Sequence, residues 1–189
     1  MKKKIITAIV LALLFSCKDD KKAEIKSETV ITTSKAKPEL ADPGIAEYYD
    51  THHETIGGWL KIGVDASRVI ENFGNDYNAA EGEISQVNGM YWQEWDYPDN
   101  GVTLLMESEN AESQKSVIQI TLYKPSRLQT SRGIAIGSSA GDVRKAYADV
   151  INNKESSGQS IVAGSIYSGV IFTIADNAVS EIFIGAAVE

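Results

Sequence analysis

The sequence predicts an α+β fold made of two repeats, each a helix followed by a three-stranded antiparallel meander, with the helices packed on one sheet face. The first observation is an internal match between Ile62-Gly63 and Ile136-Gly137. When these are aligned, the downstream pairs have the spacing of one buried helix face: Ala66 with Ala140, Val69 with Val143, and Phe73 with Tyr147. The second observation is that three strand-like runs follow each helix.

The chain begins with features typical of a secretory signal peptide. Three lysines precede an apolar run over residues 5–15, which is shorter than the about 20 residues of a membrane span. We therefore expect residues 1–16 to be removed. Leu14-Phe15-Ser16-Cys17 resembles the bacterial lipobox, and Cys17 is the only cysteine. The resemblance implies that Cys17 is acylated and anchors the protein to the membrane, and we predict that this is the bacterial outer membrane.

Residues 17–41 are predicted to be the lipidated cysteine and a flexible tether. The stretch after Cys17 has no aromatic residue and no sustained periodicity, so it buries too little apolar surface to order itself. A flexible chain of this length spans about 30 Å. Lys18-Asp19-Asp20 resembles the surface-export signal of Bacteroidetes lipoproteins, which implies display on the cell surface.

Three helices are predicted from their starting residues. Asp42-Pro43 has the composition of a helix start, and a short helix is expected over 42–58, where a glycine pair ends it. Asp65 is the expected N-cap of the first repeat helix. Ser139, with Asp142 three residues later, forms a capping box at the start of the second.

Strands are predicted wherever short apolar or alternating runs lie between turn residues. They are 90–97, 102–107 and 116–123 in the first repeat, and 161–167, 170–174 and 178–184 in the second. Pro98-Asp99-Asn100-Gly101 and Asp176-Asn177 have the composition of hairpin turns. The first repeat is placed at 59–127 and the second at 128–189, and 59–189 is expected to be one domain.

The element order and the motif I-G-S-S-x-x-D-V at 136–143 resemble two families. These are the small outer-membrane assembly lipoproteins of the SmpA/OmlA type and the tandem-repeat β-lactamase inhibitor protein. The resemblance covers about residues 60–186 and implies a fold more than a function.

Charge and motif content exclude several functions. The formal charge is -8, and loss of three lysines with the signal peptide lowers it to -11, so nucleic acid is not an expected partner. His52 and His53 are adjacent, and neighbouring helix residues point about 100° apart, which disfavours a metal site. No G-x-S-x-G motif is present, and the glycine-rich helix start at Gly137 lacks the lysine of a phosphate loop. We predict no catalytic residue, no metal and no cofactor, and therefore not an enzyme.

The period of two divides the aromatic strand at 90–97 into unlike faces. Tyr91, Gln93, Trp95 and Tyr97 are expected to meet the helices, together with Leu104, Ile118, Ile120 and Phe172. The opposite face would carry Trp92, Leu105, Tyr123, Ile171 and Phe183 with Glu94, Asp96, Thr121 and Glu181. Exposed apolar patches rimmed by acids commonly mark interaction sites.

The sequence therefore predicts a non-catalytic, lipid-anchored envelope protein that binds a protein partner through an open sheet face. The predicted binding residues are Trp92, Glu94, Asp96, Leu105, Tyr123 and Phe183. Three alternatives stay open. The face is covered as ordinary core, or it binds carbohydrate through Trp92 and Trp95, or Glu94 and Asp96 are the carboxylate pair of a hydrolytic enzyme, since they lie about 7 Å apart on one strand.

Overall fold

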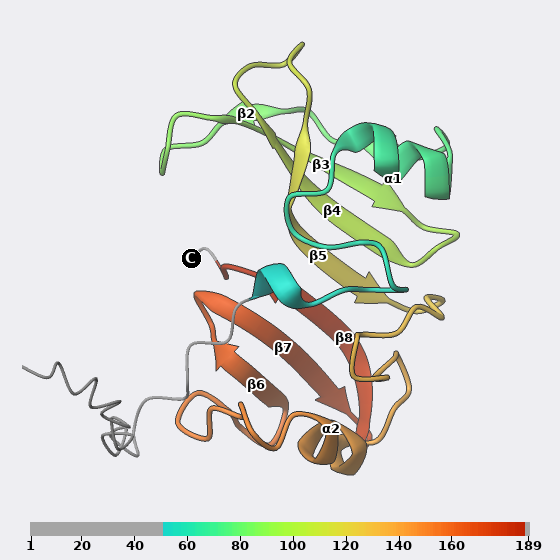
Figure 1. Ribbon diagram of the computed structural model, residues 1–189, viewed down its shortest axis with the longest axis vertical. Helices are drawn as coiled ribbons and strands as arrows, with labels where there is room; N and C mark the ends of the chain where they lie inside the picture. Colours follow the sequence, from blue (N-terminus) through green and yellow to red (C-terminus); the bar gives the residue numbers. More distant parts are fainter. Residues whose placement is uncertain (1–50, 188–189) are drawn as a thin grey trace, which may run out of the picture. The chain divides into compact units, whose positions relative to one another are not determined.

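The computed structural model describes residues 51–187, and its strands form one eight-stranded antiparallel sheet (Figure 1). Six strands are long: β3 (Tyr91–Tyr97), β4 (Val102–Ser108), β5 (Ser116–Tyr123), β6 (Ser160–Ser165), β7 (Ser168–Ala175) and β8 (Ala178–Gly185). The two short strands β1 (Asn78–Ala79) and β2 (Glu83–Ile84) both pair with β3. The order across the sheet is β1-β3-β4-β5-β8-β7-β6. The helices are α1 (Ala66–Phe73), α2 (Ala140–Ala146) and the 3-10 turn η1 (Thr51–His53).

The predicted fold class is wrong. The structure is mostly one continuous antiparallel sheet, in which β5 pairs directly with β8, and not two helix-plus-meander repeats with helices packed on the sheet. The helices have only eight and seven residues, and each buries one side chain fully, Val69 in α1 and Val143 in α2. Helices this short present too narrow an apolar stripe to cover eight strands.

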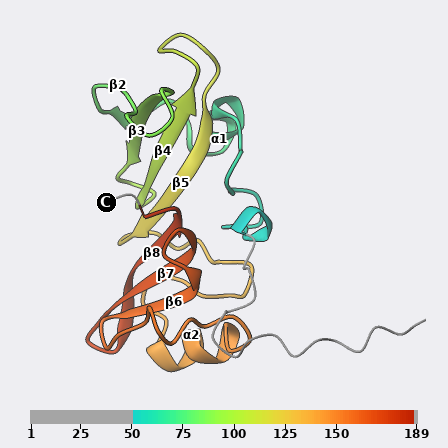
Figure 2. The ribbon, with the colours of Figure 1, turned by 90° about the vertical axis from the view of Figure 1, so that its left-hand side faces the viewer.

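Irregular segments cover much of the sheet face that the helices were expected to cover. Ile56 and Leu60, which lie in the segment before α1, are fully buried, and so is Ile134, which lies in the segment before α2, to within 3%. Figure 2 shows η1 and α1 on one side of the strands. Such segments have no periodicity, so the sequence pattern gave no sign of their part in the core.

The six long strands lie within a few residues of their predicted positions, and the predicted hairpin turns are present. Asp176 and Asn177 have φ of 51° and 60°, the left-handed pair that a two-residue hairpin requires. Gly101 has φ of 61°, and a Cβ there would lie 2.3 Å from the Tyr123 carbonyl oxygen. Any larger residue would therefore push the turn at Gly101 away from the end of β5.

The glycine before each helix donates a backbone hydrogen bond to the last of the three long strands that follow that helix. The Gly63 N–H donates to the Val117 carbonyl and the Gly137 N–H to the Val179 carbonyl, both at 2.8 Å. Of the two predicted caps, Ser139 accepts the Asp142 N–H through its side chain, whereas Asp65 makes no side-chain cap. The sequence match at the two glycines therefore reflects a shared backbone contact, although the architecture inferred from it is wrong.

A buried carboxylate fastens the segment after η1 to the second half of the chain. Glu54 is 1% exposed and accepts the Ser131 N–H at 2.7 Å and the Tyr147 hydroxyl at 3.0 Å. The Ser131 hydroxyl donates to the same carboxylate. These bonds hold the covering segment over the core, because moving the segment away would take these hydrogen-bond donors from a buried carboxylate.

The N-terminal predictions lie largely outside the described residues. These are the signal peptide, the lipidated Cys17, the tether, and residues 42–50 of the helix expected over 42–58. The described part of that helix holds only η1, and Ile56 is already bridged to Leu60 and Thr130. Within 51–187, no helix is long and apolar enough to cross a membrane.

Candidate binding surface

The two faces of the sheet differ in burial. Along β4, Val102, Leu104 and Met106 are fully buried under the helices and covering segments, whereas Leu105 and Glu107, which alternate with them, are partly exposed. The opposite face is therefore accessible to solvent among the described residues, and we call it the open face. It carries Trp92, Glu94 and Asp96 of β3, Leu105 and Glu107 of β4, Gln119 and Tyr123 of β5, Ile171 of β7, and Glu181 and Phe183 of β8.

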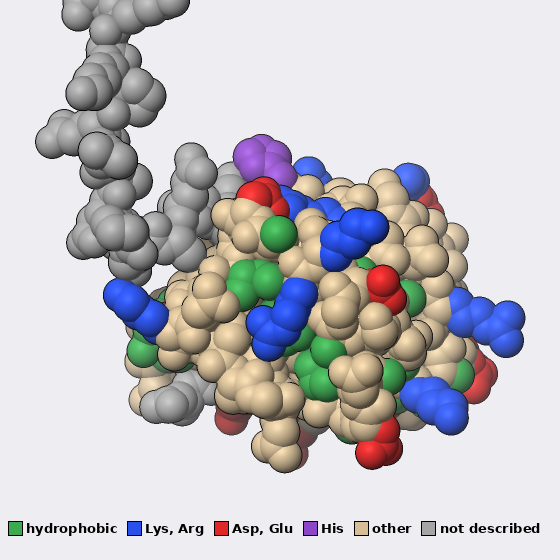
Figure 3. Space-filling view, turned by 90° about the horizontal axis from the view of Figure 1, so that it is seen from below, with side chains coloured by type: hydrophobic (Ala, Val, Ile, Leu, Met, Phe, Trp, Pro, Cys, Tyr) green, Lys and Arg blue, Asp and Glu red, His purple; other side chains and the backbone are tan. Residues whose placement is uncertain are grey.

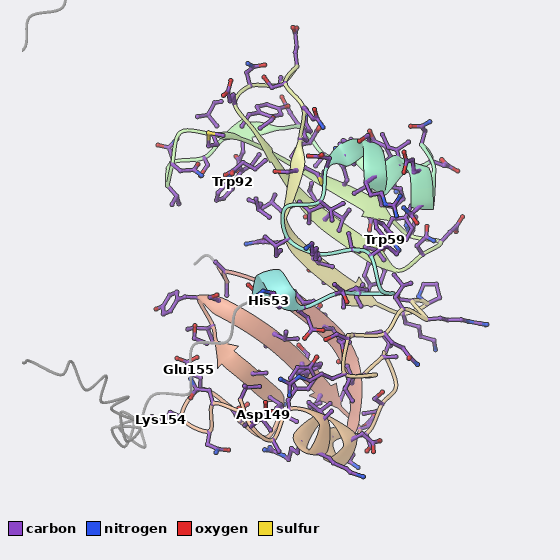
Figure 4. All side chains as sticks on the ribbon, in the orientation of Figure 1. His53, Trp59, Trp92, Asp149, Lys154 and Glu155 are labelled. Carbon is purple, nitrogen blue, oxygen red and sulfur yellow. The ribbon has the colours of Figure 1, made fainter. Side chains whose placement is uncertain are left out.

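The predicted division of β3 into two faces is confirmed. Trp95 and Tyr97 are 5% and 1% exposed, and Trp95 stacks on Tyr77 with ring centroids 4.2 Å apart. Trp92 lies on the open face, beside β2, whereas Trp59 lies beside α1 (Figure 4). Trp92 and Trp95 face opposite ways, so the two rings do not form one surface on which a sugar could stack.

One predicted core residue lies on the wrong face. Ile118 was expected beside Ile120 in the core, but β5 has a bulge there: Met106 pairs with Val117 and Leu105 with Gln119. The extra residue shifts the alternation by one position. Val117 is fully buried in its place, and Ile118 is partly exposed.

Two hollows lie next to each other on the open face. The first has a volume of about 460 Å³ and is lined by Trp92, Leu105, Gln119, Ile171 and Phe183, with Glu83 and Glu181 beside them. The second has about 400 Å³ and is lined by Val87, Asn88, Glu107, Ile118 and Tyr167. They share Trp92, Gln119 and Ala187, so we treat them together as the groove.

The rim of the groove carries exposed apolar side chains that sequence reasoning missed. Val87 and Tyr167 are 72% and 71% exposed. Among the described residues, the one other exposed large hydrophobic residue is Ile84, which is next to Glu83 in β2. Val87 and Tyr167 lie in turns, where a single apolar residue carries no periodic signal. Their clustering at one groove is what distinguishes them from scattered surface residues.

Hydrogen bonds fix the polar groups at one end of the groove. The Trp92 indole N–H donates to Glu107 Oε2 at 2.8 Å, and the Asn88 side-chain amide donates to the same oxygen at 2.6 Å. The indole therefore has its polar partner on the protein, and its ring is held in place as apolar surface.

The other predicted polar residues form a separate cluster. The Tyr123 hydroxyl donates to Asp96 Oδ1 at 2.6 Å, and the Thr103 hydroxyl donates to the same oxygen at 2.9 Å. Burial, together with the hydrogen bond to Asp96, raises the pKa of Tyr123 to about 12. Neither Tyr123, Asp96 nor the exposed Glu94 lines the groove, so the structure brings together only Trp92, Leu105 and Phe183 of the predicted set.

The charge on the open face has one sign. None of the eight strands that the structure describes contains a lysine, arginine or histidine, and the charged residues lining the groove are Glu83, Glu107 and Glu181. The lower end of the domain, where α2 lies, differs, because several lysine and arginine side chains are spread over it (Figure 3). The groove thus has an apolar floor in a negative field.

The described residues offer no assembled metal centre. No group of three or more histidine, cysteine, aspartate or glutamate side chains within 51–187 could hold an ion. His53 is exposed in η1 and lines neither hollow of the groove. Glu94 and Asp96 share a face, but Asp96 is occupied by two hydroxyl donors.

Comparison with known proteins found no family model, no curated protein and no solved structure that matches this chain. The resemblance to the SmpA/OmlA-type lipoproteins and the β-lactamase inhibitor protein therefore stays a prediction.

Proposed function

We propose that this protein is a non-catalytic, lipid-anchored envelope protein that binds a protein partner through the groove on its open face. The observation that carries the proposal is the coincidence of two apolar hollows with the exposed side chains of Val87 and Tyr167. Contiguous exposed apolar surface is uncommon on proteins that bind nothing, and a rigid tryptophan at its centre is typical of binding hot spots.

Binding through the face fits the sheet better than binding through its edges. The outer edge of β6 is already occupied, since the Asn152 N–H donates to the Val162 carbonyl and the Gly164 N–H to the Val150 carbonyl. At the other edge, β1 and β2 have two residues each. Short or covered edges offer little backbone for strand addition.

Membrane attachment is proposed through Cys17, on the sequence pattern alone. Two or more acyl chains hold a protein stably at a membrane, whereas one does not. With a tether of about 30 Å, the groove would stand clear of the lipid headgroups. Lys18-Asp19-Asp20 supports display on the outer surface of the outer membrane.

Labelling cells with an alkyne fatty acid tests the anchor. The wild-type chain should incorporate the label, and Cys17→Ala should lose it completely. Label retained by the alanine variant would contradict the lipoprotein assignment. Protease added to intact cells should remove the protein, and full protection would place the domain on the inner side of the membrane.

Site-specific photocrosslinking tests the binding function. The crosslinking residue p-benzoylphenylalanine replaces Val87 or Tyr167 at the groove rim, and Arg144 on the exposed side of α2 as the matched control. In the cells that naturally produce the protein, both rim positions should give the same crosslinked species. The control position should not give it, and Phe183→Glu should abolish it.

Equal crosslinking from Arg144 and from the rim would show nonspecific proximity in the membrane. Rim crosslinks that survive Phe183→Glu would mean that the partner does not enter the groove. Either result would contradict the proposed function.

A further inference from the structure

The charges around the groove restrict which partner fits it. Glu83, Glu107 and Glu181 line the two hollows, and no cation does. Lys124 and Arg127 line a different hollow, with Ile136 and Val179. An anionic partner would be repelled on approach, whereas a cationic one would be attracted and oriented.

Of the three carboxylates that line the groove, Glu107 has the orientation and burial most favourable for binding a cation. Trp92 and Asn88 both donate to Oε2, and no residue among those that the structure describes donates to Oε1. The side chain is half-buried, so its charge is less screened than that of a surface carboxylate. Because two bonds already fix its orientation, little side-chain entropy remains to be lost on binding.

Apolar surface adjoins this carboxylate on two sides. Val87 and Tyr167 lie in the same hollow as Glu107, and Trp92 connects that hollow to the one lined by Phe183.

We propose that the groove takes a polypeptide segment in which a lysine or arginine binds Glu107 and neighbouring apolar side chains enter the two hollows. The inference rests on the proposed function and makes its partner specific. A second copy of the same face would oppose acids to acids, and anionic lipid headgroups or phosphates would meet the same repulsion.

Fluorescence anisotropy with three labelled ten-residue peptides tests this. One alternates leucine with arginine, one alternates leucine with glutamate, and one alternates serine with arginine. The protein is the mature chain, residues 17–189, produced without lipid so that no detergent is present. Only the leucine-arginine peptide should bind strongly, and raising the salt should weaken it.

The decisive variant is Glu107→Gln, with Glu109→Gln as its matched control. Glu109 follows the end of β4, is exposed and lines neither hollow, so both changes remove one negative charge from neighbouring positions. Glu107→Gln should weaken peptide binding about tenfold or more, as expected for a charge-assisted hydrogen bond, and should reduce its salt dependence. Glu109→Gln should leave the affinity within about twofold.

Equal effects of the two substitutions, equal binding of the leucine-glutamate peptide, or no binding of the leucine-arginine peptide would overturn the inference. Binding of chitohexaose instead of the leucine-arginine peptide would also overturn it, because it would assign the groove to a glycan. A dimer that appears in sedimentation and that Phe183→Glu disrupts would overturn it as well. Rim crosslinks as strong in Glu107→Gln cells as in wild-type cells would overturn it while leaving the proposed function intact.

Discussion

The two faces of the sheet come from the same strands but differ in what covers them. On the core face, Trp95 and Leu104 meet helices and irregular segments, and both are almost completely buried. On the open face, their neighbours Trp92 and Leu105 line a groove that remains open to solvent in the described residues. Residues of the same type on one strand therefore differ in burial according to the face on which they lie.

The largest expected effect contrasts two adjacent leucines of β4. Leu104→Glu places a charge in the fully buried core and should destabilise the fold by more than about 4 kcal/mol, so that little folded protein is recovered. Leu105→Glu places the same charge on the open face and should change the free energy of unfolding by about 1 kcal/mol or less. Chemical denaturation measures both. A Leu105→Glu variant that also fails to fold would show that the open face is core.

A smaller effect is expected at Glu54, whose hydrogen bonds hold the covering segment on the core face. Glu54→Gln keeps the size of the side chain but replaces one acceptor oxygen with an NH₂ group. This group would face a donor of Ser131 or Tyr147, so one hydrogen bond is lost. We expect a loss of about 1–3 kcal/mol in the free energy of unfolding. Glu181→Gln on the open face is the control and should be nearly neutral. Equal stability of Glu54→Gln and wild type would mean that this buried network does not hold the covering segment.

The smallest effect concerns alkaline pH and involves one tyrosine from each face. The pKa of Tyr97 in the core, through burial and its proximity to Tyr77, and that of Tyr123 on the open face are both raised to about 12. Because the unfolded pKa is about 10, each tyrosine contributes stability that is fully present below pH 10. That contribution is lost as the pH rises from about 10 to 12.

Denaturation at several pH values between 9 and 12 checks this. Tyr123→Phe should lose less stability over that range than wild type, since phenylalanine does not titrate. An identical pH dependence in the variant would contradict the raised pKa of Tyr123.

The strands could be predicted from the sequence because the two-residue alternation and turn compositions are local signals. The open-face positions of Trp92, Leu105 and Phe183 followed from that alternation. The architecture could not be predicted, because the core contributions of Ile56, Leu60 and Ile134 come from segments without periodicity. The bulge that turns Ile118 outward leaves no mark in the sequence either.

Only part of the groove could be predicted from the sequence, for the same reason. Its rim residues Val87 and Tyr167 are single apolar residues in turns, and they reach the groove through pairing between distant strands. The hydrogen bonds of Glu107 to Trp92 and Asn88 join side chains far apart in the chain. By contrast, Asp96 and Tyr123 were predicted for binding on face alone, but they bind each other.

Paired unfolding measurements on Trp92→Ala and Trp95→Ala test most directly whether the open face is a surface. The two residues lie on one strand, differ by three positions and face opposite ways. Trp95→Ala should lose about 3–5 kcal/mol in the free energy of unfolding, as expected for a buried aromatic side chain. Trp92→Ala should lose about 1 kcal/mol or less while abolishing the crosslinks at the groove rim. If Trp92→Ala destabilises the fold as much as Trp95→Ala does, both faces are core and no binding groove exists.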